Sequence, residues 1–228
     1  GNNATGFGEV DSGWANFDPI ENVEATDGSS SEFIQITWNS GTYEDYYMVY
    51  RGATSNVNNA IPVSDWVDGN SFNDCTASPS DNHYFWVRCS GDNPGEFVSN
   101  FSDYDIGWQQ AQKPVVQATH GVFNNKIVVT WDPLPGANSF RIYRSEGPYI
   151  TDTLTNWSST LNYDYEDYSV NSQTEYRYWV QGAYNNYGYK PSELSNSAYG
   201  MAGECGNLKD DPNYRSLDPK ERKDWIGA

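Results

Sequence analysis

The sequence predicts an all-β protein made of two β-sandwiches in tandem, and three observations support this. Aromatic residues make up 16% of the 228 residues, beside 20 Gly and 11 Pro, which is typical of many short strands joined by turns. Apolar and polar residues alternate with a period of two. The sequence also repeats itself at a fixed offset of 93 residues.

The repeat shows 17 identities in 85 compared positions, without a gap, when residues 23–107 are placed on 116–200. FIQITWNSGTYEDYYMVYR at 33–51 falls on KIVVTWDPLPGANSFRIYR at 126–144. One offset that holds over this length indicates two duplicated domains.

Five segments follow from the repeat. They are an N-terminal arm at 1–20, domain 1 at 21–110, a linker at 111–114, domain 2 at 115–203 and a C-terminal tail at 204–228. In the tail, Asp218 is a cap candidate and Pro219 suits a first helical position, so a short helix from about Pro219 to Trp225 is expected.

Within each repeat, three strands can be read in order. The first is QITW or VVTW, in which alternate residues such as Ile36 and Trp38, or Val129 and Trp131, share one face. The second is YMVYR or FRIYR, and the third is HYFWVRC or YRYWVQG. Turn signals such as DPLPG, SGDNPG and NNYG separate the strands, as in a sandwich of about 90 residues.

These stretches resemble bacterial fibronectin type III domains. The resemblance rests on ATxG before a strand, ITW or VTW on strand B, YxVYR or FRIYR on strand C, HYFWVRC or YRYWVQG on strand F, a Gly-containing FG loop and a Ser-rich strand G. It covers about 23–107 and 116–200. It implies tandem immunoglobulin-like sandwiches with seven strands each, Trp38 and Trp131 as core anchors, and a spacer, adhesion or recognition role rather than catalysis.

The resemblance also implies a tyrosine corner at the start of strand F. Tyr176 occupies this position in domain 2, within VNSQTEY. Domain 1 departs from the pattern, because ASPSDNH places His83 there. We expect His83 to be structural, with a ring nitrogen in the bond that the tyrosine would make.

In the strand arrangement of that family, Tyr47, Val49, Phe85 and Val87 point inward. Tyr50, Trp86, Tyr143 and Trp179 then point outward, and each domain has an Arg nearby. These aromatic side chains could form a platform for sugar rings or a protein partner. The alternative is cross-strand packing, with arginines over the rings, and the occurrence of the arrangement in both repeats favours it.

The FG loop of domain 2, AYNNYGYKPSE, is the best recognition candidate. Tyr184, Tyr187 and Tyr189 stand there among Asn and Gly, the residue types that binding loops favour. The alternative is an ordinary turn with exposed tyrosines.

The net charge of −18 is concentrated in residues 1–110, where 17 acidic and 2 basic residues give −15. Such acidity argues against nucleic acid and anionic membrane surfaces as partners, and no apolar run is long enough to span a bilayer. Acidic clusters at 65–74 and 103–105 could hold calcium, although they match no EF-hand or RTX pattern. Asp74 recurs as Asp167, so we expect it to fix a turn.

No other cofactor and no catalytic motif is indicated. The chain has two His and no nucleophile elbow, HExxH, P-loop or GxGxxG. Of the three cysteines, Cys75 and Cys89 would lie too far apart for a disulfide, and Cys205 could meet either only if the tail folds back. We expect free, buried thiols.

We therefore expect a non-catalytic, extracellular or cell-surface interaction and spacer module that binds a protein or a glycan. One alternative is an accessory carbohydrate-binding region of a secreted polysaccharide hydrolase. Another is a self-assembling subunit, in which the arm with Trp14 and the tail with Trp225 dock, and the basic residues of the tail, such as Lys220, contact acidic domain 1.

Overall fold

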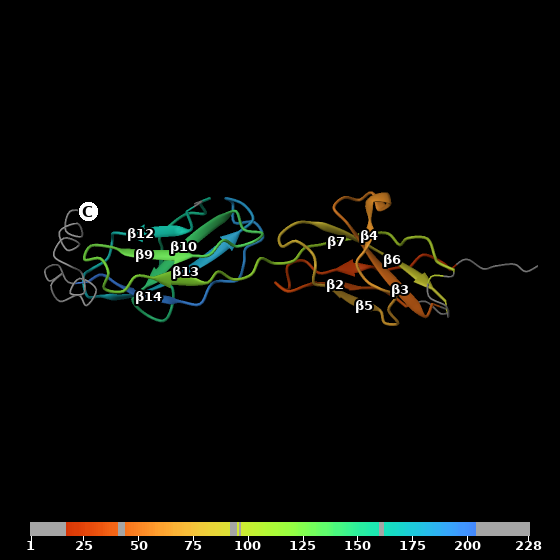
Figure 1. Ribbon diagram of the computed structural model, residues 1–228, viewed down its shortest axis with the longest axis horizontal. Helices are drawn as coiled ribbons and strands as arrows, with labels where there is room; N and C mark the ends of the chain where they lie inside the picture. Colours follow the sequence, from red (N-terminus) through yellow and green to blue (C-terminus); the bar gives the residue numbers. More distant parts are fainter. Residues whose placement is uncertain (1–16, 41–43, 92–94, 96, 160–161, 204–228) are drawn as a thin grey trace, which may run out of the picture. The chain divides into compact units, whose positions relative to one another are not determined.

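The chain forms two compact units, Gly1–Gln110 and Ala111–Ala228 (Figure 1). Each unit has its own hydrophobic core. They are called domain 1 and domain 2 below. Both consist of antiparallel strands, which confirms the predicted fold class. Among the residues that the structure describes, no helix is long and apolar enough to cross a bilayer. The computed structural model describes residues 17–40, 44–91, 95, 97–159 and 162–203.

Domain 1 is a sandwich of two sheets, with strand orders β1-β2-β5 and β4-β3-β6-β7. A 3-10 turn, η1 (Val57–Asn59), lies between β3 and β4. The strands are β1 (Glu24–Ala25), β2 (Ile34–Thr37), β3 (Tyr46–Gly52), β4 (Ile61–Pro62), β5 (Ser71–Asp74), β6 (His83–Ser90) and β7 (Asp105–Gly107).

Domain 2 repeats this arrangement, with strand orders β8-β9-β12 and β11-β10-β13-β14. Its strands are β8 (Val116–Ala118), β9 (Ile127–Trp131), β10 (Ser139–Ser145), β11 (Asp152–Thr153), β12 (Asp164–Asp167), β13 (Glu175–Ala183) and β14 (Ala198–Met201). The predicted tail helix lies outside the described residues.

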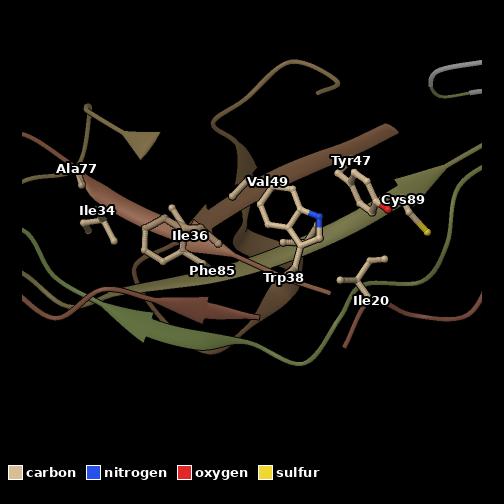
Figure 2. Close-up of a cluster of buried hydrophobic side chains, with 10 residues drawn as sticks. Ile20, Ile34, Ile36, Trp38, Tyr47, Val49, Ala77, Phe85 and Cys89 are labelled. Carbon is tan, nitrogen blue, oxygen red and sulfur yellow. The ribbon is translucent and has the colours of Figure 1, made fainter. Parts of the chain in front are cut away.

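The inward faces of both sheets fill the core of domain 1 (Figure 2). Tyr47 and Val49 from β3 and Phe85 and Val87 from β6 are buried, as the family resemblance implied. Trp38 is buried as well, and Trp131 is buried at the same place in domain 2. The core extends into the predicted arm, because Ile20 is a buried member and Phe17 packs against it.

The Ser-rich segment before the last strand completes each sheet through side chains. Ser102 Oγ accepts the backbone N–H of Val87 at 2.9 Å, and Ser195 Oγ accepts that of Val180 at 2.9 Å. Two residues further along the same strands, Ser99 Oγ accepts the N–H of Cys89 at 3.0 Å, and Ser192 Oγ accepts that of Gly182 at 3.0 Å. These hydroxyls satisfy buried donors that would otherwise need a paired backbone.

The offset of 93 residues fails in one stretch. β4 pairs Pro62 with Tyr50, and β11 pairs Thr153 with Tyr143, so the equivalent residues here are 91 apart. Beyond this stretch the offset of 93 returns, because Trp38 N bonds Asn70 O and Trp131 N bonds Tyr163 O. The η1 loop of domain 1 is longer and the following loop is shorter, and the two changes cancel in an ungapped comparison.

Candidate functional site

The FG loop of domain 2 follows β13 and is held by hydrogen bonds within the loop. Tyr184 N–H donates to the Tyr189 carbonyl at 2.9 Å and closes the loop. Asn185 Oδ1 accepts the N–H groups of Tyr187 at 3.0 Å and Tyr189 at 3.3 Å. Gly188 N–H donates to the Asn185 carbonyl at 3.0 Å. These bonds favour a single backbone conformation for the loop.

A tryptophan supports this loop from the segment that follows β11. A Cβ on Gly188 would lie 2.3 Å from Trp157 Nε1, and Gly188 has φ of +77°, so only glycine fits. The guanidinium of Arg141 lies 4.7 Å from the centroid of the Trp157 ring. Domain 1 uses the same device, with Gly95 against Trp66.

The three predicted tyrosines of the FG loop all reach the surface. Tyr187 is 92% exposed, Tyr189 is 57% exposed and Tyr184 is 38% exposed. The ammonium of buried Lys190 lies 5.7 Å from the ring centroids of Tyr184 and Tyr189. The loop therefore presents Tyr187 to solvent while its neighbours stay close to a buried cation.

The predicted open platform on the outer sheet face is wrong for its two tryptophans. Trp86 is 3% exposed and Trp179 is 8% exposed, so neither offers a free ring face. In domain 1 the cover includes Tyr104, whose ring centroid lies 5.8 Å from that of Trp86. The alternation of side chains along β6 correctly gives the sheet face to which Trp86 points. It does not indicate which residues cover that face.

The two tyrosines predicted beside these tryptophans are half-buried. The ring of Tyr50 meets Phe101 edge to face at 4.9 Å, and Tyr143 Oη donates to Gln181 Oε1 at 3.2 Å. Arginines do stack on rings, as the packing interpretation predicted, but the rings are others: Arg88 lies over Phe101 and Arg177 over Tyr199. Cross-strand packing therefore accounts for Tyr50 and Tyr143.

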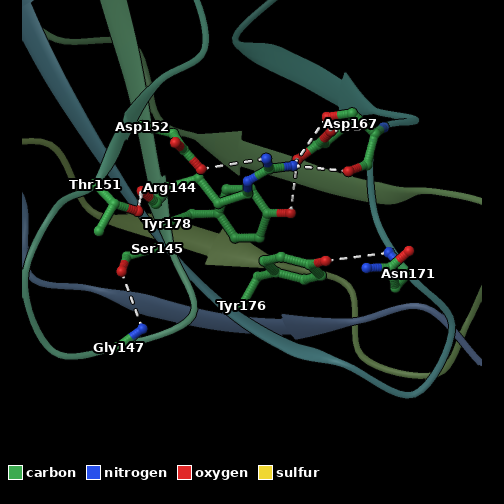
Figure 3. Close-up of polar contacts among 10 residues, drawn as sticks. Arg144, Ser145, Gly147, Thr151, Asp152, Asp167, Asn171, Tyr176 and Tyr178 are labelled. Atoms are coloured by element: carbon green, nitrogen blue, oxygen red, sulfur yellow. Dashed lines mark hydrogen bonds and ion pairs between the residues drawn. The ribbon is translucent and has the colours of Figure 1, made fainter.

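A buried ion pair occurs at the same place in both domains, and the sequence interpretation missed it. Arg144 Nη1 donates to Asp167 Oδ2 at 2.8 Å (Figure 3), and Arg51 pairs with Asp74. Both carboxylates are 1% exposed. The signal was present in the repeat, since the Arg and the Asp recur together.

Asp74 and Asp167 also fix a turn, as predicted. Asp167 Oδ1 accepts both the backbone N–H and the hydroxyl of Ser169, and Asp74 Oδ1 accepts the same two groups of Thr76. In domain 2 alone, a tyrosine adds a bond, because Tyr178 Oη donates to Asp167 Oδ2 at 2.9 Å.

In domain 2, these contacts shift the pKa values of Asp167 and Tyr178. Burial by itself would raise the pKa of Asp167, but bonds from Ser169 and Tyr178 and the charge of Arg144 bring that pKa below its ordinary value. Burial and the neighbouring Asp167 carboxylate raise the pKa of Tyr178, which keeps the phenol protonated. The arrangement is a stable structural pair, with no group prepared for proton transfer.

The corner residues behave as the family resemblance predicted. Tyr176 Oη accepts the backbone N–H of Asn171 at 3.1 Å (Figure 3). In domain 1, His83 Nε2 lies 3.1 Å from the carbonyl oxygen of Ser78, the residue equivalent to Asn171. A ring nitrogen thus bridges the same loop as the tyrosine hydroxyl does, which fits a structural role for His83.

The cysteines differ from one another. Cys75 and Cys89 are free thiols, as predicted, but only Cys89 is buried, and Cys75 is exposed. Burial raises the pKa of the Cys89 thiol, so it is a poor nucleophile. Cys205 lies outside the described residues.

One carboxylate from each acidic cluster serves the fold. Asp105 Oδ2 accepts the N–H of Ala25 at 2.7 Å, and Asp74 is committed to Arg51. Within the described ranges, no group of three or more His, Cys, Asp and Glu side chains is placed to hold a metal ion. Calcium stays an untested possibility of the sequence.

A shallow hollow of about 370 Å³ lies in the loop between β10 and β11. Its acidic side chains are Glu146 and Asp152, and Asp152 lies 3.3 Å from Arg144. His83 belongs to domain 1, far along the chain from this hollow. Nothing in the hollow resembles a nucleophile beside a base.

Comparison with known proteins supports the fold. No family model matches this chain, and no curated protein matches it. A two-domain fibronectin type III segment from chicken tenascin matches with a TM-score of 0.55 and 14% identity, over 80% of this chain and 98% of that segment. The FN1–FN3 domains of chicken CNTN1 match with 16% identity over 83% of this chain and 66% of that one, but the TM-score of 0.35 carries no weight. The chain has the fold of tandem fibronectin type III domains.

Proposed function

We propose that this chain is a non-catalytic, extracellular or cell-surface interaction and spacer module, and that the FG loop of domain 2 makes the contact. Domains of this fold typically serve as adhesion or spacer modules. Fold alone does not assign a function, so the argument rests on the loop itself.

The observation that carries the proposal is an exposed ring on a fixed loop. Tyr187 is 92% exposed, although burying it would be favourable by about 1.5–3 kcal/mol for a large apolar side chain. Its backbone is held by Asn185, and the loop is packed on Trp157. A rigid tyrosine loses little conformational entropy on binding, which is why such residues dominate binding loops.

A glycan is one class of partner that this loop suits, and it corresponds to the accessory carbohydrate-binding alternative. Tyr187 and Tyr189 offer ring faces, and exposed Asn138 and Asn186 lie in the loops at the same end of the domain. Aromatic faces beside amide groups match the apolar and hydroxyl faces of a sugar ring. The buried Trp86 and Trp179 contribute nothing to this alternative.

The test is an array that carries glycans beside random peptides, probed with the labelled chain. Tyr187→Ala should abolish the specific signals. Tyr149→Ala is the matched control, because Tyr149 is 82% exposed in the loop that follows β10, away from the FG loop. Signals that survive Tyr187→Ala, or that both variants lose equally, would contradict the proposal. Polysaccharide hydrolysis by the chain would overturn the non-catalytic assignment.

A further inference from the structure

The outward side of the larger sheet in domain 1 is made of aromatic rings. Because Phe85 and Val87 are buried in the core, their neighbours Tyr84 and Trp86 on β6 point outward. Tyr50 on β3 lies opposite Trp86 in the strand register and therefore shares this side. An antiparallel sheet of this kind usually turns polar side chains to water, so the aromatic outward side is a departure from the common pattern.

Five of the rings form one connected surface. The ring centroid of Tyr104 lies 5.2 Å from that of Tyr84 and 5.8 Å from that of Trp86. The ring of Tyr50 meets that of Phe101 at 4.9 Å. We call Tyr50, Tyr84, Trp86, Phe101 and Tyr104 the aromatic face. Tyr104 covers Trp86 and is itself 46% exposed, so the accessible layer lies over the buried tryptophan.

Domain 2 lacks part of this surface. The places of Tyr84 and Tyr104 are taken there by Arg177 and Ser197. The guanidinium of Arg177 lies 4.7 Å from the ring centroid of Tyr199, so domain 2 carries a positive charge on this side of its sheet. Because domain 2 forms the same sheet without these two rings, the fold does not require them in domain 1. An exposed apolar surface that the fold does not require is typical of an interaction site.

Carboxylates border the aromatic face. Exposed Asp45 directly precedes β3, and exposed Asp103 is the neighbour of the last ring of the aromatic face. Exposed Asp65 lies on the segment after β4 that continues to pair with β3, since Val67 N–H donates to the Tyr47 carbonyl at 2.8 Å. Domain 2 has asparagine at all three equivalent places, which are Asn138, Asn156 and Asn196. The negative border is therefore a property of domain 1.

Charge selects the kind of partner. Residues 1–110 carry −15, and their two basic residues are both engaged within the domain. Arg51 pairs with buried Asp74, and Arg88 donates to the Ser99 carbonyl at 2.8 Å. Two copies of the aromatic face would therefore repel each other. A basic segment, in contrast, would be attracted both by the carboxylates and by the ring faces.

We propose that the aromatic face binds an extended, basic segment of another protein, in which lysine or arginine side chains alternate with apolar ones. The four strands lie about 4.8 Å apart, so the face is about 14 Å wide, which is the length of about four extended residues. The apolar side chains of the segment pack on Tyr84 and Tyr104, and its cations reach the bordering carboxylates. Pro62 on the edge strand β4 has no N–H to donate, so the segment lies on the face and does not extend the sheet at that residue. This contact is independent of the FG loop of domain 2.

The experiment is fluorescence anisotropy with the full chain and a labelled peptide in which lysine alternates with valine. A peptide with glutamate in place of lysine is the comparison. We expect the basic peptide to bind at low salt, its affinity to fall at high salt, and the acidic peptide not to bind. A basic peptide that does not bind, or an acidic peptide that binds as tightly, would overturn the proposal.

The border is tested by giving domain 1 the residues of domain 2. Changing the three bordering aspartates to Asn should raise the dissociation constant of the basic peptide at least about tenfold. The matched control changes exposed Glu21, Glu24 and Glu32 to Gln, which removes the same charge on or next to β1 and β2 of the other sheet. It should change the dissociation constant by less than about twofold, because these charges are farther from the face and are screened. Equal effects of the two variants would mean a diffuse attraction to domain 1 and would overturn the proposal.

The rings are tested by Tyr84→Arg with Tyr104→Ser, which again gives domain 1 residues that domain 2 carries. This variant should weaken binding of the basic peptide at least about tenfold per folded molecule, and unchanged binding would overturn the proposal. If the variant does not fold, the aspartate variant decides, because it alters exposed side chains only. Tyr187→Ala should bind the basic peptide as the unmodified chain does, and a loss would place the peptide on the FG loop instead. High salt suppresses the contact with domain 1, so an array read at high salt reports the FG loop separately.

Discussion

The two domains bury the same Arg–Asp pair but surround it differently. Asp167 accepts from Arg144, from Ser169 and from the hydroxyl of Tyr178. At the position of Tyr178, domain 1 has Phe85, so Asp74 relies on Arg51 and Thr76. The Arg–Asp pair and its serine or threonine partner recur in both domains, and domain 2 adds the hydroxyl of Tyr178.

This comparison separates structural from functional positions. Residues that recur with the same partners, such as Arg51 and Arg144, are explained by the fold. The FG loop tyrosines occur in one copy only, and the fold does not require them. Contacts with partners are therefore expected at positions where the copies differ.

The largest effect should come from removing the shared carboxylate. Asp167→Ala removes the buried partner of a largely buried guanidinium, which keeps only half-exposed Asp152 at 3.3 Å, and should destabilise domain 2 by about 3–5 kcal/mol. Asp74→Ala should cost about 1 kcal/mol less in domain 1, because no tyrosine hydroxyl loses its acceptor there. Hydrogen exchange of β9 and β2 in the full chain measures the two domains separately.

The control for this pair is Asp152→Ala, which removes the half-exposed partner of Arg144 and should have a much smaller effect. If Asp167→Ala and Asp152→Ala gave similar hydrogen-exchange rates in β9, the buried Arg144–Asp167 pair would not be what stabilises domain 2.

The shared serines should give equal effects in the two domains. Ser102→Ala and Ser195→Ala each leave a buried N–H without an acceptor, at a cost of about 1–3 kcal/mol. The same exchange measurement applies, with exposed Ser71→Ala as the control. A large effect in one domain and none in the other would mean that the two strand edges are not equivalent.

Tyr178→Phe gives domain 2 the residue that domain 1 carries. The lost hydroxyl should destabilise domain 2 by about 1–2 kcal/mol, since the carboxylate keeps its other donors. Tyr168→Phe removes an exposed hydroxyl bonded to Glu166 and should leave stability unchanged. If Tyr178→Phe were as neutral as its control, the extra bond would be incidental.

The smallest effect is a dependence on acid. Because the folded pKa of Asp167 lies below its ordinary value of 3.8, its contribution is complete above about pH 4 and is lost as the pH falls through the folded pKa. Tyr178→Phe removes one contact that lowers this pKa, so it should flatten the acid dependence of domain 2. Denaturant titrations of both proteins between pH 6 and pH 2 test this, and parallel curves would contradict it.

Sequence reasoning reached the fold because alternation and repetition are local signals. The family resemblance placed Tyr47 and Val49 inward and identified the corner at Tyr176. Sequence reasoning missed the cover of Trp86, because Tyr104 comes from a later segment that only the folded chain brings back. The two-residue shift between Trp66 and Trp157 was also hidden, since two loop-length changes cancel along the sequence.

The most direct test of the difference between shared and unique positions compares two variants of domain 2. For each variant, the signal on the glycan and peptide array is divided by the amount of folded protein. Tyr187→Ala changes a position that occurs once, and should lose the signal while the denaturation midpoint stays constant. Ser195→Ala changes a shared position, and should lower the midpoint while the signal per folded molecule stays constant. The opposite result, with binding lost through Ser195 and retained without Tyr187, would contradict the account.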